Sequence, residues 1–170
     1  MTRQPDAFFS TSRLRAERLA PAHLRDLTDL HLDPEVSRYL GGVRSPAETK
    51  EYLDVNLAHW DRHGFGLWVF RTAEGSFAAR AGLRCTQIDG VPEIEIAYTV
   101  HRNLWGRGLA TEIAHALVTI WRDAELTASL VGIASLGNEP SRRILERVGL
   151  TYERDTSYHD AEVAVYRAVY

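Results

Sequence analysis

Apolar and polar residues along the chain recur with the periods of strands and helices. Residues 13–17 alternate between polar and apolar types, as a half-buried strand does. Leucines at helical intervals follow Pro21, and Pro34 ends or breaks that helix. A capping box at residues 45–48 begins the next helix. The remaining patterns predict strands over 65–70, 77–88, 93–100, 130–134, 151–158 and 161–170, and helices over 46–63, 108–123 and 138–148.

The order of these elements predicts the fold class. A strand and helices precede three antiparallel strands, and a helix, a strand, a helix and two closing strands follow. This order predicts an α+β fold in which about four helices cover a mixed, mostly antiparallel sheet of about seven strands. The chain has 170 residues, 45% of them hydrophobic, which suits a single domain over residues 1–170.

Composition narrows the class of partner. Twenty basic against 23 acidic side chains give a net charge of −3, so we expect no nucleic-acid partner. No stretch approaches the roughly 18 apolar residues of a membrane span, and the N-terminal residues lack the apolar run of a signal peptide. Cys85 is the single cysteine, which excludes an internal disulfide and fits a reducing compartment. We therefore expect a cytoplasmic protein.

The segment LWGRGLATE carries the most specific chemical signal. It lies between a predicted strand and a predicted helix, and it places Gly106 and Gly108 where the helix begins. Glycine lets backbone approach a ligand closely, and the N–H groups at a helix start bind phosphate. The N–H groups of residues 107–110 are therefore candidates for holding a diphosphate. The P-loop signature and Gly-x-Gly-x-x-Gly are both absent.

With this order of elements, the chain resembles the GNAT superfamily of acyl-CoA-dependent N-acyltransferases. The superfamily pattern is Gln or Arg, two residues, Gly, one residue, then Gly or Ala, and residues 105–110 match it with Trp105 in first place. The stretches TSRLRAERL, PEVSRYLGG and NEPSRRILERVGL resemble the branch that acetylates ribosomal-protein N-termini. The resemblance implies acetyl-CoA as cosubstrate. The residues that it implies at the cofactor are Thr99, Val100, Trp105, Gly106, Arg107, Gly108, Leu109, Ala110, Thr111, Asn138 and Ser141.

Direct acetyl transfer to a primary amine needs a base for the amine and a proton for the leaving thiolate. Glu93 and Glu95 lie two residues apart on one strand face, so both can enter one cleft as acid or base. The resemblance favours Glu95, and a water between the two is an alternative. Backbone N–H near Thr99 or Val100 would hold the thioester oxygen, where the family's strand leaves its neighbour. Ser141 is either a proton donor to the thiolate or a helix cap.

Several alternatives stay open at this point. Asn138 can cap its helix, contact the cofactor, or do both. His59 and His63 have the spacing of two metal ligands, but no third ligand is evident, so we predict no metal. The acceptor is a peptide N-terminus or a small amine such as an aminoglycoside, which an acidic cleft would bind. A non-catalytic acyl-CoA sensor is the alternative of another class, and the protein is a monomer or a homodimer.

Overall fold

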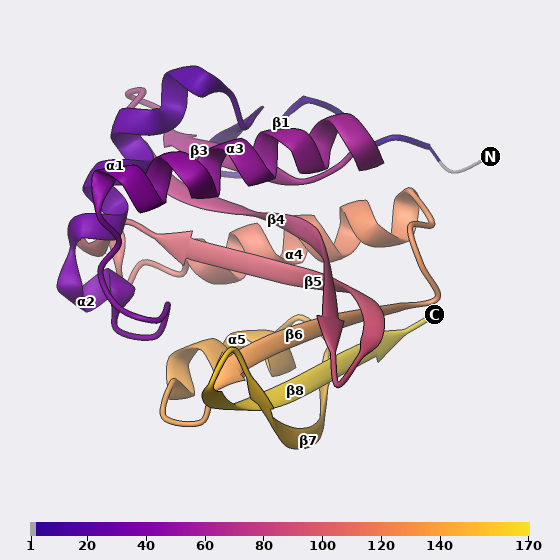
Figure 1. Cartoon of the computed structure of the whole chain (residues 1–170). Helices are drawn as coiled ribbons and strands as arrows, with labels where there is room; N and C mark the ends of the chain where they lie inside the picture. The colour runs from indigo at the N-terminus through magenta and orange to yellow at the C-terminus, as the bar shows by residue number, and fades with distance from the viewer. Residues whose placement is uncertain (1–2) are drawn as a thin grey trace.

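One eight-stranded sheet runs through the protein, in a computed structural model that describes residues 3–170 (Figure 1). The strands lie in the order β1-β2-β3-β4-β5-β6-β8-β7. Neighbours are antiparallel except β5 and β6, which run parallel. The strands are β1 (Phe8–Ser10), β2 (Leu14–Arg18), β3 (Leu67–Thr72), β4 (Phe77–Ile88), β5 (Val91–Val100), β6 (Ser129–Ser135), β7 (Thr151–Tyr158) and β8 (Ala161–Val169).

Helices cover both faces of this sheet. In Figure 1, α3 crosses in front of the strands and α4 lies behind β4 and β5. The α-helices are α1 (Leu24–Leu32), α2 (Pro34–Ser37), α3 (Pro46–His63), α4 (Leu109–Asp123) and α5 (Glu139–Arg147), and 3-10 turns occupy Pro21–His23 and Arg102–Leu104. The start of α3 is the predicted capping box, in which Ser45 Oγ accepts from the Glu48 N–H at 3.2 Å.

The predicted class is confirmed, and the element counts need correction. The described residues form eight strands rather than about seven and five α-helices rather than about four. The extra strand, β1, has three residues and lies at the sheet edge, too short for an alternating pattern to reveal. The extra helix, α2, is one turn, and the Asp33 side chain caps it by accepting from the Glu35 N–H at 2.9 Å.

Tight packing between α3 and β3 fixes the centre of the sheet. Trp60 and Trp68 are buried against each other, and the Trp60 indole donates to the Leu67 carbonyl at 2.7 Å. A Cβ at Gly82 would overlap the Gly66 backbone, so only glycine fits there. No helix within residues 3–170 is both long enough and apolar enough to cross a membrane.

Candidate active site

The sheet opens between its two parallel strands. β5 extends to Val100 and β6 to Ser135, yet their register pairs only Glu95 with Val131 and Ile96 with Gly132. Beyond Ile96 the two strands separate. The opening confirms the departure of a strand from its neighbour that the family resemblance implied, and it leaves one edge of β5 unpaired near the motif turn.

Backbone direction along β5 decides which groups face this opening. The His101 N–H donates to the Ala78 carbonyl at 2.8 Å, so this residue is bonded toward β4. Backbone groups alternate in direction along a strand. Thr99 therefore faces β4, whereas Tyr98 and Val100 face the opening. Of the two donors named for the thioester oxygen, the N–H of Val100 is the one directed into the gap.

Side-chain hydrogen bonds hold the glycine turn of residues 105–108 in place. The indole of Trp105 donates to the Val100 carbonyl at 2.8 Å, which fastens the turn to the end of β5 and gives tryptophan a role at this place. On the far side, Arg13 Nη1 donates to the Arg107 carbonyl at 2.8 Å. Arg13 is itself paired with Glu112, with 2.6 Å between Nε and Oε2.

The amides of this turn are free to bind a ligand. Gly106 and Gly108 have φ of 75° and 74°, the left-handed region that favours glycine. Gly108 begins α4 without a side-chain cap. Within residues 3–170, no protein acceptor bonds the N–H groups of residues 106–111. A row of unpaired donors at the positive end of a helix is an anion site by its physics.

One pocket of about 1350 Å³ connects the turn, the opening and the start of α5. Most predicted site residues line it. These are Glu95, Thr99, Val100, Trp105, Gly106, Gly108, Leu109, Ala110, Thr111, Asn138 and Ser141. Arg107 is exposed outside the pocket and reaches the site through its backbone. The structure thus brings together groups that lie up to 46 positions apart in the sequence (Glu95 to Ser141).

Glu95 is the most buried of the four glutamates that line this pocket. Its residue is 7% exposed, and Arg84 Nη2 donates to its Oε2 at 3.1 Å. The Glu95 charge raises the pKa of the Arg84 guanidinium, so the two groups form a partly buried ion pair. One carboxylate oxygen thus has a partner, and the other is not engaged by a residue of the described chain.

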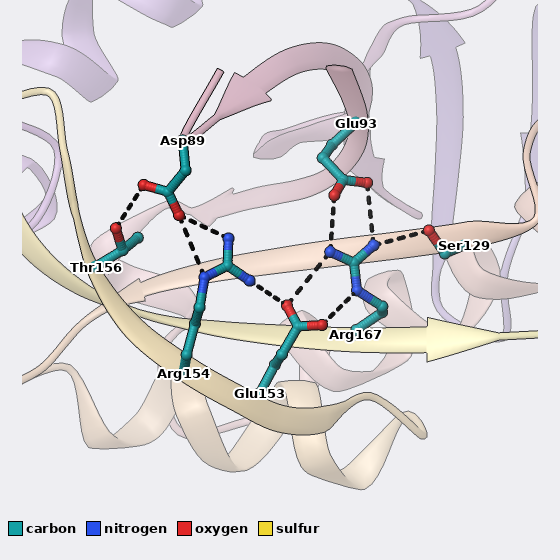
Figure 2. Close-up of polar contacts among 7 residues, drawn as sticks. All are labelled: Asp89, Glu93, Ser129, Glu153, Arg154, Thr156 and Arg167. Carbon is teal, nitrogen blue, oxygen red and sulfur yellow. Dashed lines mark hydrogen bonds and ion pairs between the residues drawn. The ribbon is translucent and has the colours of Figure 1, made fainter. Parts of the chain in front are cut away.

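Glu93 lies elsewhere, and the prediction that both carboxylates enter one cleft is wrong for it. Arg167 donates to its two oxygens at 2.7 and 3.1 Å, and Figure 2 shows this pair within a larger ionic cluster. Arg167 also bonds Ser129 at 2.8 Å and Glu153 at 2.8 Å. The cluster thus joins Glu93 of β5 to residues of β6, β7 and β8. It connects the two halves of the sheet at the closed end of the opening.

Figure 2 also shows how the cluster continues to the turn between β4 and β5. Arg154 Nη2 donates to Asp89 at 2.7 Å and also pairs with Glu153. Thr156 donates to the other Asp89 oxygen at 2.7 Å. These hydrogen bonds hold the pKa of the Asp89 carboxyl below its usual value. The cluster therefore has a structural role, because it connects the strands beside the pocket.

At the start of α5, Ser141 acquires a partner that sequence reasoning missed. The Tyr98 hydroxyl lies 3.1 Å from both the Oγ and the carbonyl oxygen of Ser141. Burial raises the pKa of Tyr98 to about 12, so this hydroxyl keeps its proton. Asn138 caps α5 by accepting from the Ser141 N–H at 3.3 Å while it lines the pocket. Tyr98 follows Glu95 by three residues on the same strand, but no local pattern links it to Ser141.

The histidine pair of α3 has a third neighbour. Cys85 joins His59 and His63 in a group whose ligand atoms lie within 4.8 Å of one another, so the expectation that no third ligand is near is wrong. However, both nitrogens of His59 are used. Nδ1 donates to the Phe65 carbonyl at 2.8 Å, and Nε2 accepts from the Cys85 N–H at 2.9 Å. His59 therefore hydrogen-bonds the Phe65 carbonyl and the free edge of β4 with its two ring nitrogens.

Several known proteins are similar to this chain in sequence or in fold. The chain is 27% identical over 135 residues to the uncharacterized protein YkkB of Bacillus subtilis, covering 79% of this chain and 78% of that protein. A crystal structure of an acetyltransferase from Agrobacterium tumefaciens matches with a TM-score of 0.85 and 27% identity, over 98% of this chain and 96% of the other.

A third match is RimL, a ribosomal L7/L12 α-N-protein acetyltransferase in complex with coenzyme A. Its TM-score is 0.79 at 17% identity, with 95% of this chain and 97% of the other covered, which shows a shared fold. The family model of the acetyltransferase (GNAT) domain matches residues 13–151, most of the chain. The free amides of the turn, the opened parallel pair and this match agree, and the chain belongs to the GNAT acetyltransferase family.

Proposed function

We propose that this acetyltransferase uses acetyl-CoA and transfers the acetyl group directly to a primary amine. The observation that carries the proposal is the row of free N–H groups at residues 106–111, which adjoins the opening between β5 and β6 in one pocket with Glu95 and Ser141. The diphosphate of acetyl-CoA would bind these amides. The acyl arm would then run along the unpaired edge of β5 toward Glu95.

The proposed reaction has no covalent enzyme intermediate. The neutral amine attacks the thioester carbon, a C–N bond forms, and the oxyanion binds the N–H of Val100. Glu95 accepts the proton that the amine loses. The C–S bond then breaks, and the thiolate takes a proton from Ser141 Oγ, to which the Tyr98 hydroxyl passes its own proton. As the products leave, Glu95 loses its proton to water and water returns one to Tyr98, so both groups regain their starting state. Each proton is thus assigned to a group that lines this pocket or contacts a group that does.

The acceptor in this proposal is an α-amino group, at a peptide N-terminus or on a small molecule. An α-amino group has a pKa near ~8 and reaches the neutral form more readily than a lysine near ~10.4. The pocket lining includes six arginines and four glutamates, so it does not form the acidic cleft that a polycationic aminoglycoside would need. The proposal places the enzyme in a reducing compartment such as the cytoplasm, where Cys85 stays a free thiol.

Calorimetry with acetyl-CoA, followed by coenzyme A release from a panel of peptides and amines, tests the function. Glu95→Gln should lower kcat by about 10²-fold or more and leave acetyl-CoA affinity unchanged. Glu93→Gln is the matched control, because it makes the same change on the same strand outside the pocket. Equal turnover of the Glu95→Gln variant and the native enzyme would remove Glu95 from the mechanism, and absent acetyl-CoA binding would overturn the whole proposal.

A further inference from the structure

Two arginines meet in the pocket wall without an anion. Arg80 of β4 is 3% exposed, and Arg44 is half-buried in the loop before α3. Their guanidinium carbons each lie 4.8 Å from the centre of the Tyr52 ring. Among residues 3–170, no carboxylate lies within ion-pair distance of either group. Arginine is almost never buried this deeply unless a negative group compensates it.

The side chain that contacts both arginines directly is a neutral histidine. Arg80 Nε donates to His31 Nε2 at 3.1 Å, and Arg44 Nη1 lies 3.4 Å from the same nitrogen. His31 Nδ1 lies 3.0 Å from Thr49 Oγ1, so the ring donates there and accepts from the arginines. Burial, with the two guanidinium charges, lowers the pKa of His31 to about 3. The ring is therefore neutral, and it gives neither arginine an ion-pair partner.

Tyr52 adds an unused donor to the same place. Its hydroxyl is buried and has no hydrogen-bond partner in the described part of the chain. A buried hydroxyl without a partner is unfavourable, so such groups usually serve a ligand or a water. Arg44, Arg80 and Tyr52 all line the pocket. Together they present several N–H donors and one O–H donor, the set that a carboxylate accepts.

The position of this group relative to the reaction is informative. Arg80 pairs with Thr99 across the β4–β5 ladder, and Arg84 pairs with Glu95 four residues further on. Opposite residues of an antiparallel pair share a face, so Arg80 and Glu95 lie on the same face of the sheet. The turn amides lie beyond the end of β5, at residues 106–111. The arginine pair and Glu95 thus line one face of the same pocket.

We propose that the acceptor is a primary amine that also carries a carboxylate, which binds Arg80, Arg44 and the Tyr52 hydroxyl while the amine faces Glu95. This inference rests on the proposed function and narrows its substrate class. The carboxylate has two possible sources, the α-carboxylate of a free amino acid or an acidic side chain next to a peptide N-terminus. In both cases the anion sits within a few bonds of the amine and orients it toward the thioester.

Binding of acetylated products tests the inference without requiring turnover. In the presence of coenzyme A, calorimetry compares N-acetylalanine with N-acetylalaninamide, and acetyl-alanyl-glutamate amide with its glutamine counterpart. Each pair differs only in the charge of one group. We expect at least a 10-fold lower Kd for the carboxylate member of one pair, because hydrogen bonds to charged groups are the strong ones. The pair that discriminates identifies the source of the carboxylate.

Variants assign the preference to the arginines. Arg44→Gln, at a half-buried position, should abolish the preference and leave the Kd of coenzyme A unchanged. Arg80→Met makes the same test of the carboxylate preference at the buried arginine of the pair. Arg38→Gln is the control, since Arg38 is an exposed arginine of the same pocket.

Three results would overturn the inference. They are equal affinities within both pairs, no binding of either carboxylate compound at about 10 mM, and a preference that survives Arg44→Gln. If the preference holds while no amine is ever acetylated, the proposed function fails and the anion site stands.

Discussion

The buried His31 makes stability depend on pH in a way that one substitution can isolate. Its side chain is fully buried between α1, α3 and β4, and its Nε2 accepts from Arg80. Burial first, then the charges of Arg80 and Arg44, lower its pKa to about 3 from the ordinary 6.5. The native state therefore keeps the ring neutral down to a pH at which the unfolded chain has already bound a proton.

The sign and size of the effect follow from these two pKa values. A histidine whose native pKa is depressed stabilises the fold above pH 6.5, and this contribution is lost as pH falls from 6.5 toward 3. At pH 5, which is about 1.5 units below the pKa of histidine in the unfolded chain, the unfolded state binds a proton that the native state does not. This difference lowers the free energy of unfolding by about 2 kcal/mol. In a domain of this length, 2 kcal/mol corresponds to a Tm lower by about 4–8 °C.

The assay is urea unfolding of the native protein and of His31→Gln at pH 7.5 and pH 5. Glutamine offers an amide oxygen to Arg80 and has no titrating group. The free energy of unfolding should fall by about 2 kcal/mol more in the native protein than in the variant. His115→Gln, on the exposed side of α4, controls for the loss of a histidine. Parallel loss of stability in the native protein and His31→Gln would refute the reasoning.

Two further variants examine the leaving-group side and the packing beneath it. Tyr98→Phe keeps the buried ring and removes the hydroxyl next to Ser141. The kcat should therefore fall by about 10-fold or more, while the Kd of acetyl-CoA stays unchanged. An unaltered kcat in the coenzyme A release assay would exclude Tyr98 from proton transfer. Gly132→Ala would push a Cβ into the Leu145 side chain and should lower the free energy of unfolding by about 1–3 kcal/mol. In urea unfolding, the double variant with Leu145→Ala should lose less stability than the sum of the two single losses, whereas additive losses would contradict the contact.

Local features of this protein were readable from its residues because their causes are local. A helix or strand needs only its own periodicity and caps, so α3 and β4 have the predicted bounds. The turn before α4 was also readable, since Gly106 and Gly108 adopt a backbone region that favours glycine at any such turn. By contrast, β1 has too few residues to carry a period, and its place in the sheet comes from pairing with β2.

The roles of side chains with distant partners depended on the tertiary structure. Glu93 and Glu95 share one strand face, yet Arg167 of β8 takes the first and Arg84 of β4 the second. The order of strands in the sheet decides which arginine lies opposite each carboxylate, and no periodicity within β5 contains that order.

The same reason explains the pairs that the sequence did not reveal. Tyr98 meets Ser141 across 43 residues, and His31 meets Arg80 across 49. Periodicity states which face of an element a residue occupies, but only chain packing selects the group that it contacts there. The primary structure alone therefore determined most of the elements and the glycine turn before α4, while the assembled sheet decided which carboxylate, hydroxyl and arginine reach the pocket.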